Sequence, residues 1–288
     1  MTYFAKFFVF LILLKILLVS TQEDNFTFLV TGGYRPWKHT LVKHMVSIRH
    51  IESKSFFGSM HYCGGAILSS QTILTAAHCV YDITSEQKIN KKFIRIVAKT
   101  PNRLKKTRHT NIIKVDDIVL HPKYDHNSFG NDVAILRLKN PVDEDGDYAE
   151  RIKLADGPPI AGTKCTVVGW GTIFERGPLA ADALYVDISI MTMRLCKVYY
   201  RIFMDGMLCA GNLRDPERDV CQGDSGGPLI CNGKLTGVVS FGGGCGIVPG
   251  GYADVWYYRN WIMTGGKDRT SIKLWIVLLL TLLVWIVI

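Results

Sequence analysis

Three short segments carry residue types that together can attack an acyl carbon. They are Leu74-Thr-Ala-Ala-His78-Cys79, Asn131-Asp132-Val-Ala-Ile-Leu136 and Cys221-Gln-Gly-Asp-Ser225-Gly-Gly-Pro228. A serine hydroxyl is a weak nucleophile at neutral pH, so it needs an imidazole to accept its proton and a carboxylate to orient that imidazole. Ser225, His78 and Asp132 supply these groups, which predicts nucleophilic acyl transfer.

The surroundings of Ser225 and Asp132 suit these roles. Gly223, Gly226 and Gly227 flank the serine, and glycine tolerates unusual dihedral angles and close approach of a substrate to the backbone. We expect the amides of Gly223 and Ser225 to form an oxyanion hole, where each donor contributes about 3 to 4 kcal/mol. Asp132 opens an apolar run, so we expect a partly buried carboxylate that is hydrogen bonded to the histidine.

The elements that must position these residues are predicted to be strands. Short runs rich in β-branched or apolar residues, separated by Gly, Pro, Asn and Asp, extend from about Val30 to Thr264. Clear examples are residues 65–69, 133–138, 166–170 and 235–241. One helix is expected over 254–263, with Val255, Tyr258 and Ile262 on one face and Trp261 beside them. The fold class is therefore all-β.

The segments TAAHC, DVAIL and GDSGGP, in this order, closely resemble the trypsin and chymotrypsin family of serine peptidases over about Val30 to Thr264. The resemblance implies two packed six-stranded antiparallel β-barrels with the active site in the cleft between them. His78 and Asp132 would belong to the first barrel and Ser225 to the second. It implies a serine endopeptidase that forms an acyl-enzyme and acts on proteins or peptides, with no cofactor and no metal.

The chain has 8 cysteines, and none lies in a CxxC pair that would indicate zinc or thioredoxin chemistry. We therefore expect disulfides, although the count alone leaves their pairing open. The resemblance implies four pairs and leaves no cysteine over. They are Cys63 with Cys79, Cys165 with Cys231, Cys196 with Cys209, and Cys221 with Cys245.

The resemblance also implies the specificity. Asp219 lies six residues before Ser225, where the family has the base of its primary specificity pocket, so Arg or Lys is expected before the scissile bond. The alternative is that Asp219 is an ordinary loop residue beside Arg218. Val220 departs from the Ser or Ala that the family usually has after this aspartate. It narrows the pocket and removes a possible hydroxyl partner, which would weaken the binding of lysine more than that of arginine. Further substrate-binding positions are Ser240, Gly242 and Gly250.

The start of the domain departs from the family pattern of a basic residue followed by IVGG. Here the chain reads Leu29-Val30-Thr31-Gly32-Gly33. The resemblance implies that a cut before Val30 frees an amine that pairs with Asp224. Because Leu29 is a poor site for a trypsin-like activator, either another protease makes the cut or activation is incomplete.

The two ends predict a route through the secretory pathway. Residues 1–20 have the pattern of a signal peptide, with an N-terminal membrane anchor as the alternative, and 21–29 would be a short pro-segment before the peptidase domain at 30–264. Residues 265–288 form a polar spacer and an apolar tail. We interpret the tail as a GPI signal, with a short transmembrane segment or a tail packed on the body as alternatives. An extracellular, surface-held protein is expected.

The formal net charge is +9, and basic residues crowd between Lys88 and Arg108. This cluster is either a solvated surface or a docking surface for an acidic partner or polyanion. It occupies the place of an acidic calcium loop in some family members, so calcium is not expected there, and no nucleic acid partner is expected. Two rival functions stay open, namely a non-catalytic homologue that binds peptides or regulates, and a surface adhesion or scaffold protein.

Overall fold

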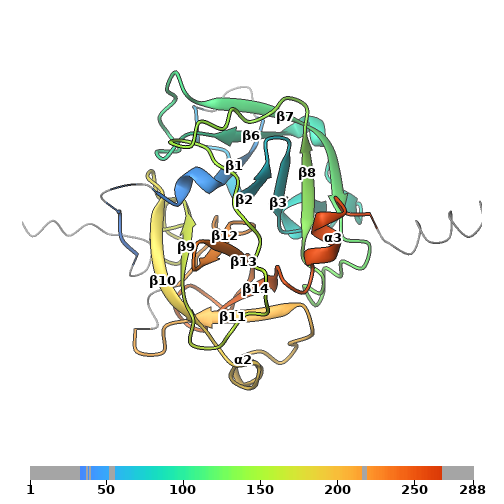
Figure 1. The fold of residues 1–288 in the computed structure, drawn as a ribbon, viewed down its shortest axis with the longest axis vertical. Helices are drawn as coiled ribbons and strands as arrows, with labels where there is room; N and C mark the ends of the chain where they lie inside the picture. Colours follow the sequence, from blue (N-terminus) through green and yellow to red (C-terminus); the bar gives the residue numbers. More distant parts are fainter. Residues whose placement is uncertain (1–32, 37, 39, 52–55, 216–218, 268–288) are drawn as a thin grey trace, which may run out of the picture.

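Two closed barrels of antiparallel strands form the body of the protein (Figure 1). The computed structural model describes residues 33–267 apart from 37, 39, 52–55 and 216–218. The first barrel has the order β1-β2-β3-β8-β7-β6 and the second β10-β11-β14-β13-β12-β9. The strands of the first are β1 (Met45–His50), β2 (His61–Ser69), β3 (Thr72–Thr75), β6 (Ile94–Ala98), β7 (Asn111–Leu120) and β8 (Ala134–Leu138). Those of the second are β9 (Lys164–Gly169), β10 (Leu184–Ile190), β11 (Met207–Gly211), β12 (Pro228–Cys231), β13 (Lys234–Phe241) and β14 (Gly250–Asp254).

The predicted strands and barrels are confirmed, and the core follows from the apolar runs. The four expected strand segments correspond to β2, β8, β9 and β13. Strands such as β8 and β13 are buried along nearly their whole length, because one side faces a barrel interior and the other is covered by neighbouring chain. A small two-stranded sheet, β4 (Tyr81–Asp82) with β5 (Gln87–Lys88), lies outside the barrels.

The terminal helix is shorter than predicted. α3 covers Arg259–Met263, and the residues before it form turns. The reason lies at Asp254, which ends β14 and whose Oδ1 accepts hydrogen bonds from the backbone N–H groups of Trp256 at 2.8 Å and Tyr257 at 3.3 Å. The predicted buried face is nonetheless correct, since Val255, Tyr258, Trp261 and Ile262 are all buried.

A second helix was not predicted. α2 covers Met193–Tyr199, and the Thr192 side chain caps it by accepting a hydrogen bond from the Leu195 N–H at 3.2 Å. In the part of the chain that the structure describes, three further segments form short 3-10 helices, Val42–His44, His78–Val80 and Lys91–Phe93.

The structure joins all eight cysteines in the four pairs that the resemblance implied. The predicted signal peptide, the pro-segment, Val30 and nearly all of the C-terminal tail lie outside the described residues. Within the described ranges, none of the helices has the length and apolar character of a membrane span.

Candidate active site

His78 and Asp132 are joined directly. His78 begins the short helix that follows β3, and Asp132 lies just before β8, which pairs with β3. His78 Nδ1 lies 2.8 Å from Asp132 Oδ2, and the His78 backbone N–H donates to Asp132 Oδ1 at 2.8 Å. Asp132 is 1% exposed, so this carboxylate is held in one orientation and fixes both the ring and the backbone of the histidine.

A third bond to Asp132 comes from the second barrel. The Ser240 hydroxyl, on β13, donates to Asp132 Oδ2. The sequence indicated Ser240 only as a substrate-binding residue. Its bond to a carboxylate 108 positions away depends on how the barrels pack, so no local pattern could have shown it.

The loop that carries Ser225 leaves the second barrel and lies against the first. The Ser225 carbonyl accepts a hydrogen bond from the Gly64 N–H of β2 at 2.7 Å. Gly226, at φ +74°, leaves no room for a side chain, because a Cβ would lie 2.2 Å from Thr75 Oγ1 and 2.6 Å from the Gly64 carbonyl oxygen. The adjacent Cys63 is bonded to Cys79, the residue after His78, so the serine loop and the histidine meet where the barrels touch.

Within the described residues, the Ser225 hydroxyl has no hydrogen bond to His78. Such bonds are often long or poorly aligned in substrate-free sites and tighten when substrate binds. The amides of Gly223 and Ser225 donate to no acceptor in the described part of the chain, whereas the Asp224 N–H between them donates to the Cys221 carbonyl at 3.1 Å. In the described part of the chain, the loop of Ser225 therefore holds two N–H groups without an acceptor, a feature that an oxyanion hole would need.

Asp219 is a buried carboxylate held by backbone amides. Its Oδ1 accepts from the Val220 N–H at 2.8 Å, and amides of Gly246 and Gly250 also bond to it. Burial raises the pKa of this carboxyl to about 7, partly offset by these amides. A Cβ on Gly250 would lie 3.1 Å from Asp219 Oδ1 and 3.0 Å from a Val220 methyl, so glycine keeps this space clear.

Asp224 is buried beneath the serine loop. Its carboxylate accepts from the Gly171 N–H at 2.8 Å and from the Cys221 N–H at 3.0 Å. A Cβ on Gly169 would lie 1.8 Å from Asp224 Oδ1, so this glycine leaves the room that the carboxylate fills. Burial raises the pKa of Asp224 to about 6, opposed by the two amides. A cation placed beside it would lower that pKa and stabilise the charged form.

Two features bear on metals. Cys63, His78 and Cys79 bring possible ligand atoms within 4.8 Å of one another, but both sulfurs are joined in a disulfide and are not thiolate ligands. In the connection after β6, the Lys99 ammonium is buried and lies 2.7 Å from Asp143 and 3.0 Å from Asp145. This ammonium offsets part of the negative charge of those two carboxylates.

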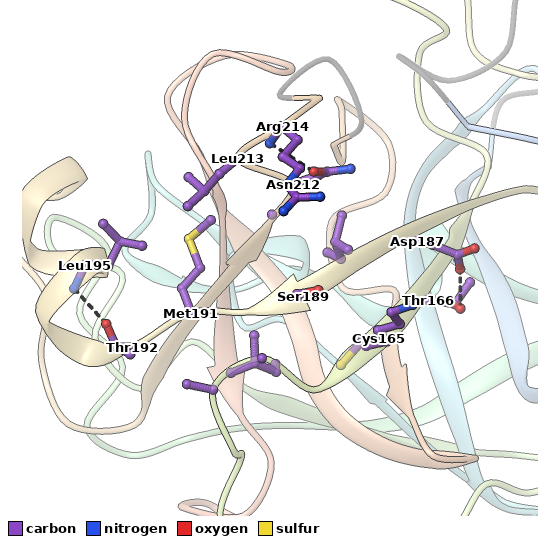
Figure 2. Close-up of a pocket in the computed structure, with 16 residues that line it drawn as sticks. Cys165, Thr166, Asp187, Ser189, Met191, Thr192, Leu195, Asn212, Leu213 and Arg214 are labelled. Carbon is purple, nitrogen blue, oxygen red and sulfur yellow. Dashed lines mark hydrogen bonds between the residues drawn. The ribbon is translucent and has the colours of Figure 1, made fainter.

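A cavity of about 830 Å³ lies elsewhere, against β10 and the start of α2 (Figure 2). Its lining includes Thr166 and Asp187, which are hydrogen bonded to each other at 2.7 Å, and Met191 and Leu213. None of His78, Asp132 and Ser225 lines it.

Comparison with known proteins agrees with this geometry. The sequence profile of the family described as Trypsin matches residues 31–262. The chain belongs to the trypsin family. It is 36% identical to Trypsin eta of Drosophila melanogaster over 91% of this chain and 95% of that protein. It is 39% identical to Trypsin zeta of the same species over 70% of this chain and 73% of that protein. Human Trypsin-3 is 32% identical, over 81% of this chain and 71% of that protein.

Membership of the trypsin family makes this protein a serine peptidase, a hydrolase acting on protein or peptide substrates. Its family and its four disulfides also fit a secreted or extracellular protein. No sequence pattern points to Phe129, whose ring lies edge-on to that of His78, with centroids 5.8 Å apart, and tilted to that of Phe241 at 6.2 Å. Its backbone has φ +55°, a conformation that the sequence gives no sign of.

Proposed function

We propose that this trypsin-family protein is an endopeptidase that cleaves after Arg or Lys, with His78, Asp132 and Ser225 as its catalytic triad. The observation that carries the proposal is the buried Asp132, bonded to both the ring and the backbone of His78 beside the loop of Ser225. A peptide-binding homologue without activity has no need of this arrangement.

The mechanism follows from the bonds already described. Because Asp132 accepts a hydrogen bond from His78 Nδ1–H, Nε2 of neutral His78 carries no proton and can take that of the Ser225 hydroxyl as its oxygen attacks the scissile carbonyl. The amides of Gly223 and Ser225 then stabilise the oxyanion. Protonated His78 gives its proton to the leaving amine. Water then attacks the acyl-enzyme while His78 accepts its proton, and His78 returns that proton to the Ser225 oxygen as the ester bond breaks.

Asp219 would set the preference for a basic side chain. A guanidinium or ammonium entering the pocket meets a carboxylate whose pKa burial has raised, and the ion pair lowers that pKa and keeps the carboxylate charged. Gly242, which has open space around its Cα, and the backbone of Ser240 would pair with the extended substrate.

The buried Asp224 supports the proposed activation. An amine freed at Val30 would offset the burial of this carboxylate and stabilise the loop of Gly223 and Ser225. Leu29 before that position means that the activating cut falls to a peptidase with a different preference. Delivery by the signal peptide at 1–20 and attachment through the tail at 265–288, by GPI or by a short transmembrane segment, complete the proposal.

Active-site labelling tests this function. The full chain, produced in a secretory cell line, should react with a biotinylated diphenyl phosphonate ester carrying an arginine side chain, because Ser225 Oγ displaces phenoxide from phosphorus. Mass spectrometry should place the adduct on Ser225, and N-terminal sequencing of the labelled protein should start at Val30. Labelling at another residue, or equal labelling after heat denaturation, contradicts the proposal.

The basic cluster between Lys88 and Arg108 supports a second proposal, that the protein binds an anionic partner. The structure divides it, because Lys99 and Arg103 are buried and Lys88 and Lys91 pair with Asp117 and Asp116. Of what remains, Lys105, Lys106 and Arg108 are exposed in the connection between β6 and β7. The basic surface proposed here takes two residues of the run and two outside it, all exposed or half-buried on or beside β6, β7 and β8. They are Lys92, Arg95, Lys114 and Lys139.

Adjacent strands place these charges side by side. Arg95 pairs directly with Lys114 across β6 and β7, and the Lys139 N–H donates to the Lys114 carbonyl at 2.9 Å. The Arg95 guanidinium bonds to the Lys92 carbonyl. Like charges directly opposite on neighbouring strands destabilise a sheet, and an anion laid across them removes that cost. A row at the strand spacing of about 4.8 Å suits a linear sulfated glycan.

Heparin is the probe for this surface. The full chain carrying Arg95→Ser and Lys114→Ser should bind heparin roughly ten- to thirtyfold more weakly, since each basic residue at an anionic surface contributes about 1 kcal/mol. The matched control is Lys164→Ser with Lys197→Ser, exposed residues of β9 and α2, which should change affinity far less. Equal losses of heparin affinity in the two double variants would mean that heparin binds through overall charge and not at this surface. Binding of an acidic peptide but not of heparin would contradict a sulfated glycan and indicate an acidic protein as the partner.

A further inference from the structure

Two buried arginines meet behind the loop that carries Ser225. Arg49, on β1, is 5% exposed, and Arg103, in the connection from β6 to β7, is 7% exposed. Arg49 Nη2 donates to the Arg103 carbonyl oxygen at 3.0 Å, and the ring of Phe57 lies 4.4 Å from the Arg49 guanidinium carbon. Neither residue belongs to the catalytic site described above.

From Arg49, a chain of hydrogen bonds reaches Gly223. Arg49 Nε donates to Ser47 Oγ at 2.8 Å, Ser47 Oγ lies 2.8 Å from His61 Nδ1, and His61 Nε2 lies 3.1 Å from the Gly223 carbonyl oxygen. The direction of each bond is fixed. A carbonyl oxygen only accepts, so Nε2 carries the ring proton, Nδ1 accepts, and the Ser47 hydroxyl donates to it. Burial supports the neutral ring, because it lowers the pKa of His61 to about 3.

From Arg103, a second path reaches the same glycine. Its guanidinium donates to three carbonyl oxygens, those of Ala180 at 2.7 Å, Gly58 at 2.6 Å and Leu179 at 3.0 Å. The Leu179 side chain packs on Gly223, where a Cβ would lie 2.6 Å from its Cδ2. Gly223 has φ +99°, a conformation that favours glycine, and its backbone contacts both the Leu179 side chain and His61.

Burying two guanidiniums side by side costs free energy. Arg103 and burial together lower the pKa of Arg49 to about 10, burial being the larger cause. A guanidinium offers five N–H donors in a rigid fork, so it can hold several backbone segments at set distances, which no apolar side chain does. The arrangement therefore fits a role in fixing geometry better than a role in stability.

We propose that Arg49 and Arg103 are positioning residues that hold the Gly223 amide in place to receive the oxyanion, one acting through Ser47 and His61 and the other through Leu179. The inference rests on the proposed function, in which Gly223 is an oxyanion donor. Neither arginine touches substrate. Each fixes the loop that does, so loosening either path lowers the rate of the chemical step and leaves the specificity pocket at Asp219 as it was.

The sharpest test is Ser47→Ala, which breaks the first path at one hydroxyl. We expect kcat for an arginine peptide amide to fall on the order of tenfold, less than the loss of about 10²- to 10³-fold when an oxyanion donor is removed outright. A peptide arginine aldehyde, whose adduct with Ser225 carries an oxyanion, should bind weaker by the same factor. Benzamidine, which fills only the pocket of a basic side chain, should bind within about twofold of the parent.

Controls separate positioning from general loosening. Ser189→Ala, on β10 of the second barrel, removes a hydroxyl of the same size and should leave all three values unchanged. If Ser47→Ala is not recovered folded, Arg103→Lys tests the second path, since it keeps the charge and loses the fork. Equal weakening of benzamidine and aldehyde, or no change in either, overturns the proposal. The proposed function fails separately, if Ser225→Ala retains turnover.

Discussion

Replacing Ser225 with alanine should lower turnover of an arginine peptide ester at least about 10⁴-fold. The variant lacks the oxygen that forms the acyl-enzyme, and only the oxyanion donors and substrate binding remain to accelerate direct attack by water. Ser225 is half-buried and its hydroxyl makes no hydrogen bond in the described part of the chain, so the thermal unfolding temperature should stay close to that of the parent. The measurement is kcat/KM beside a melting curve.

His78→Ala gives the matched comparison. Because the histidine and serine act as one unit, each single variant should lose nearly as much activity as the double variant. Additive losses in the two single variants would mean that the residues work separately. Undiminished turnover in Ser225→Ala would remove the serine from the mechanism and overturn the assignment of the catalytic triad.

Most of the fold could be predicted from local sequence patterns, because each strand is a short apolar run bounded by turn-forming residues. The apolar runs at β8 and β13 are buried in the barrels, and the loop of Ser225 needs glycine at Gly226 for a steric reason that the sequence itself suggests. The helix α2 escaped prediction because its 7 residues are too few for a clear period and it is set by a cap at Thr192 and a disulfide at Cys196. The start of α3 was misplaced because Asp254 bonds two following amides and holds them in a turn.

Contacts between distant segments could not be predicted in the same way. Ser240 reaches Asp132 from the other barrel, and His61 reaches Gly223 across 162 positions. The basic run from Lys88 to Arg108 looked uniform in sequence, yet register divides it into buried, paired and exposed residues. Charge counts alone do not separate these classes, because they differ in which strand or acidic side chain lies opposite.

The second large effect is expected at Asp219. Asp219→Ser should remove the preference for Arg and Lys, lowering kcat/KM for an arginine substrate by about 100-fold or more relative to an uncharged one, since a buried cation is left without its carboxylate. Val220→Ser is the matched control. It alters the neighbouring residue without removing the charge, so the basic preference should survive, with lysine gaining more than arginine. A library of peptides that differ before the scissile bond measures both, and an unchanged profile in Asp219→Ser contradicts the assignment.

The pH dependence of pocket binding gives an independent measure of the same carboxylate. With the pocket empty, burial raises the pKa of Asp219 to about 7, so below that pH a benzamidine cation must displace a proton to form its ion pair. Affinity should therefore rise with pH up to about 7 and level off above it. In Asp219→Ser the affinity should be weak and nearly flat over the same range, because no carboxyl at the base of the pocket remains to titrate. A slope that persists in the variant would place the titrating group elsewhere, with Asp224 and its pKa of about 6 the next to be replaced.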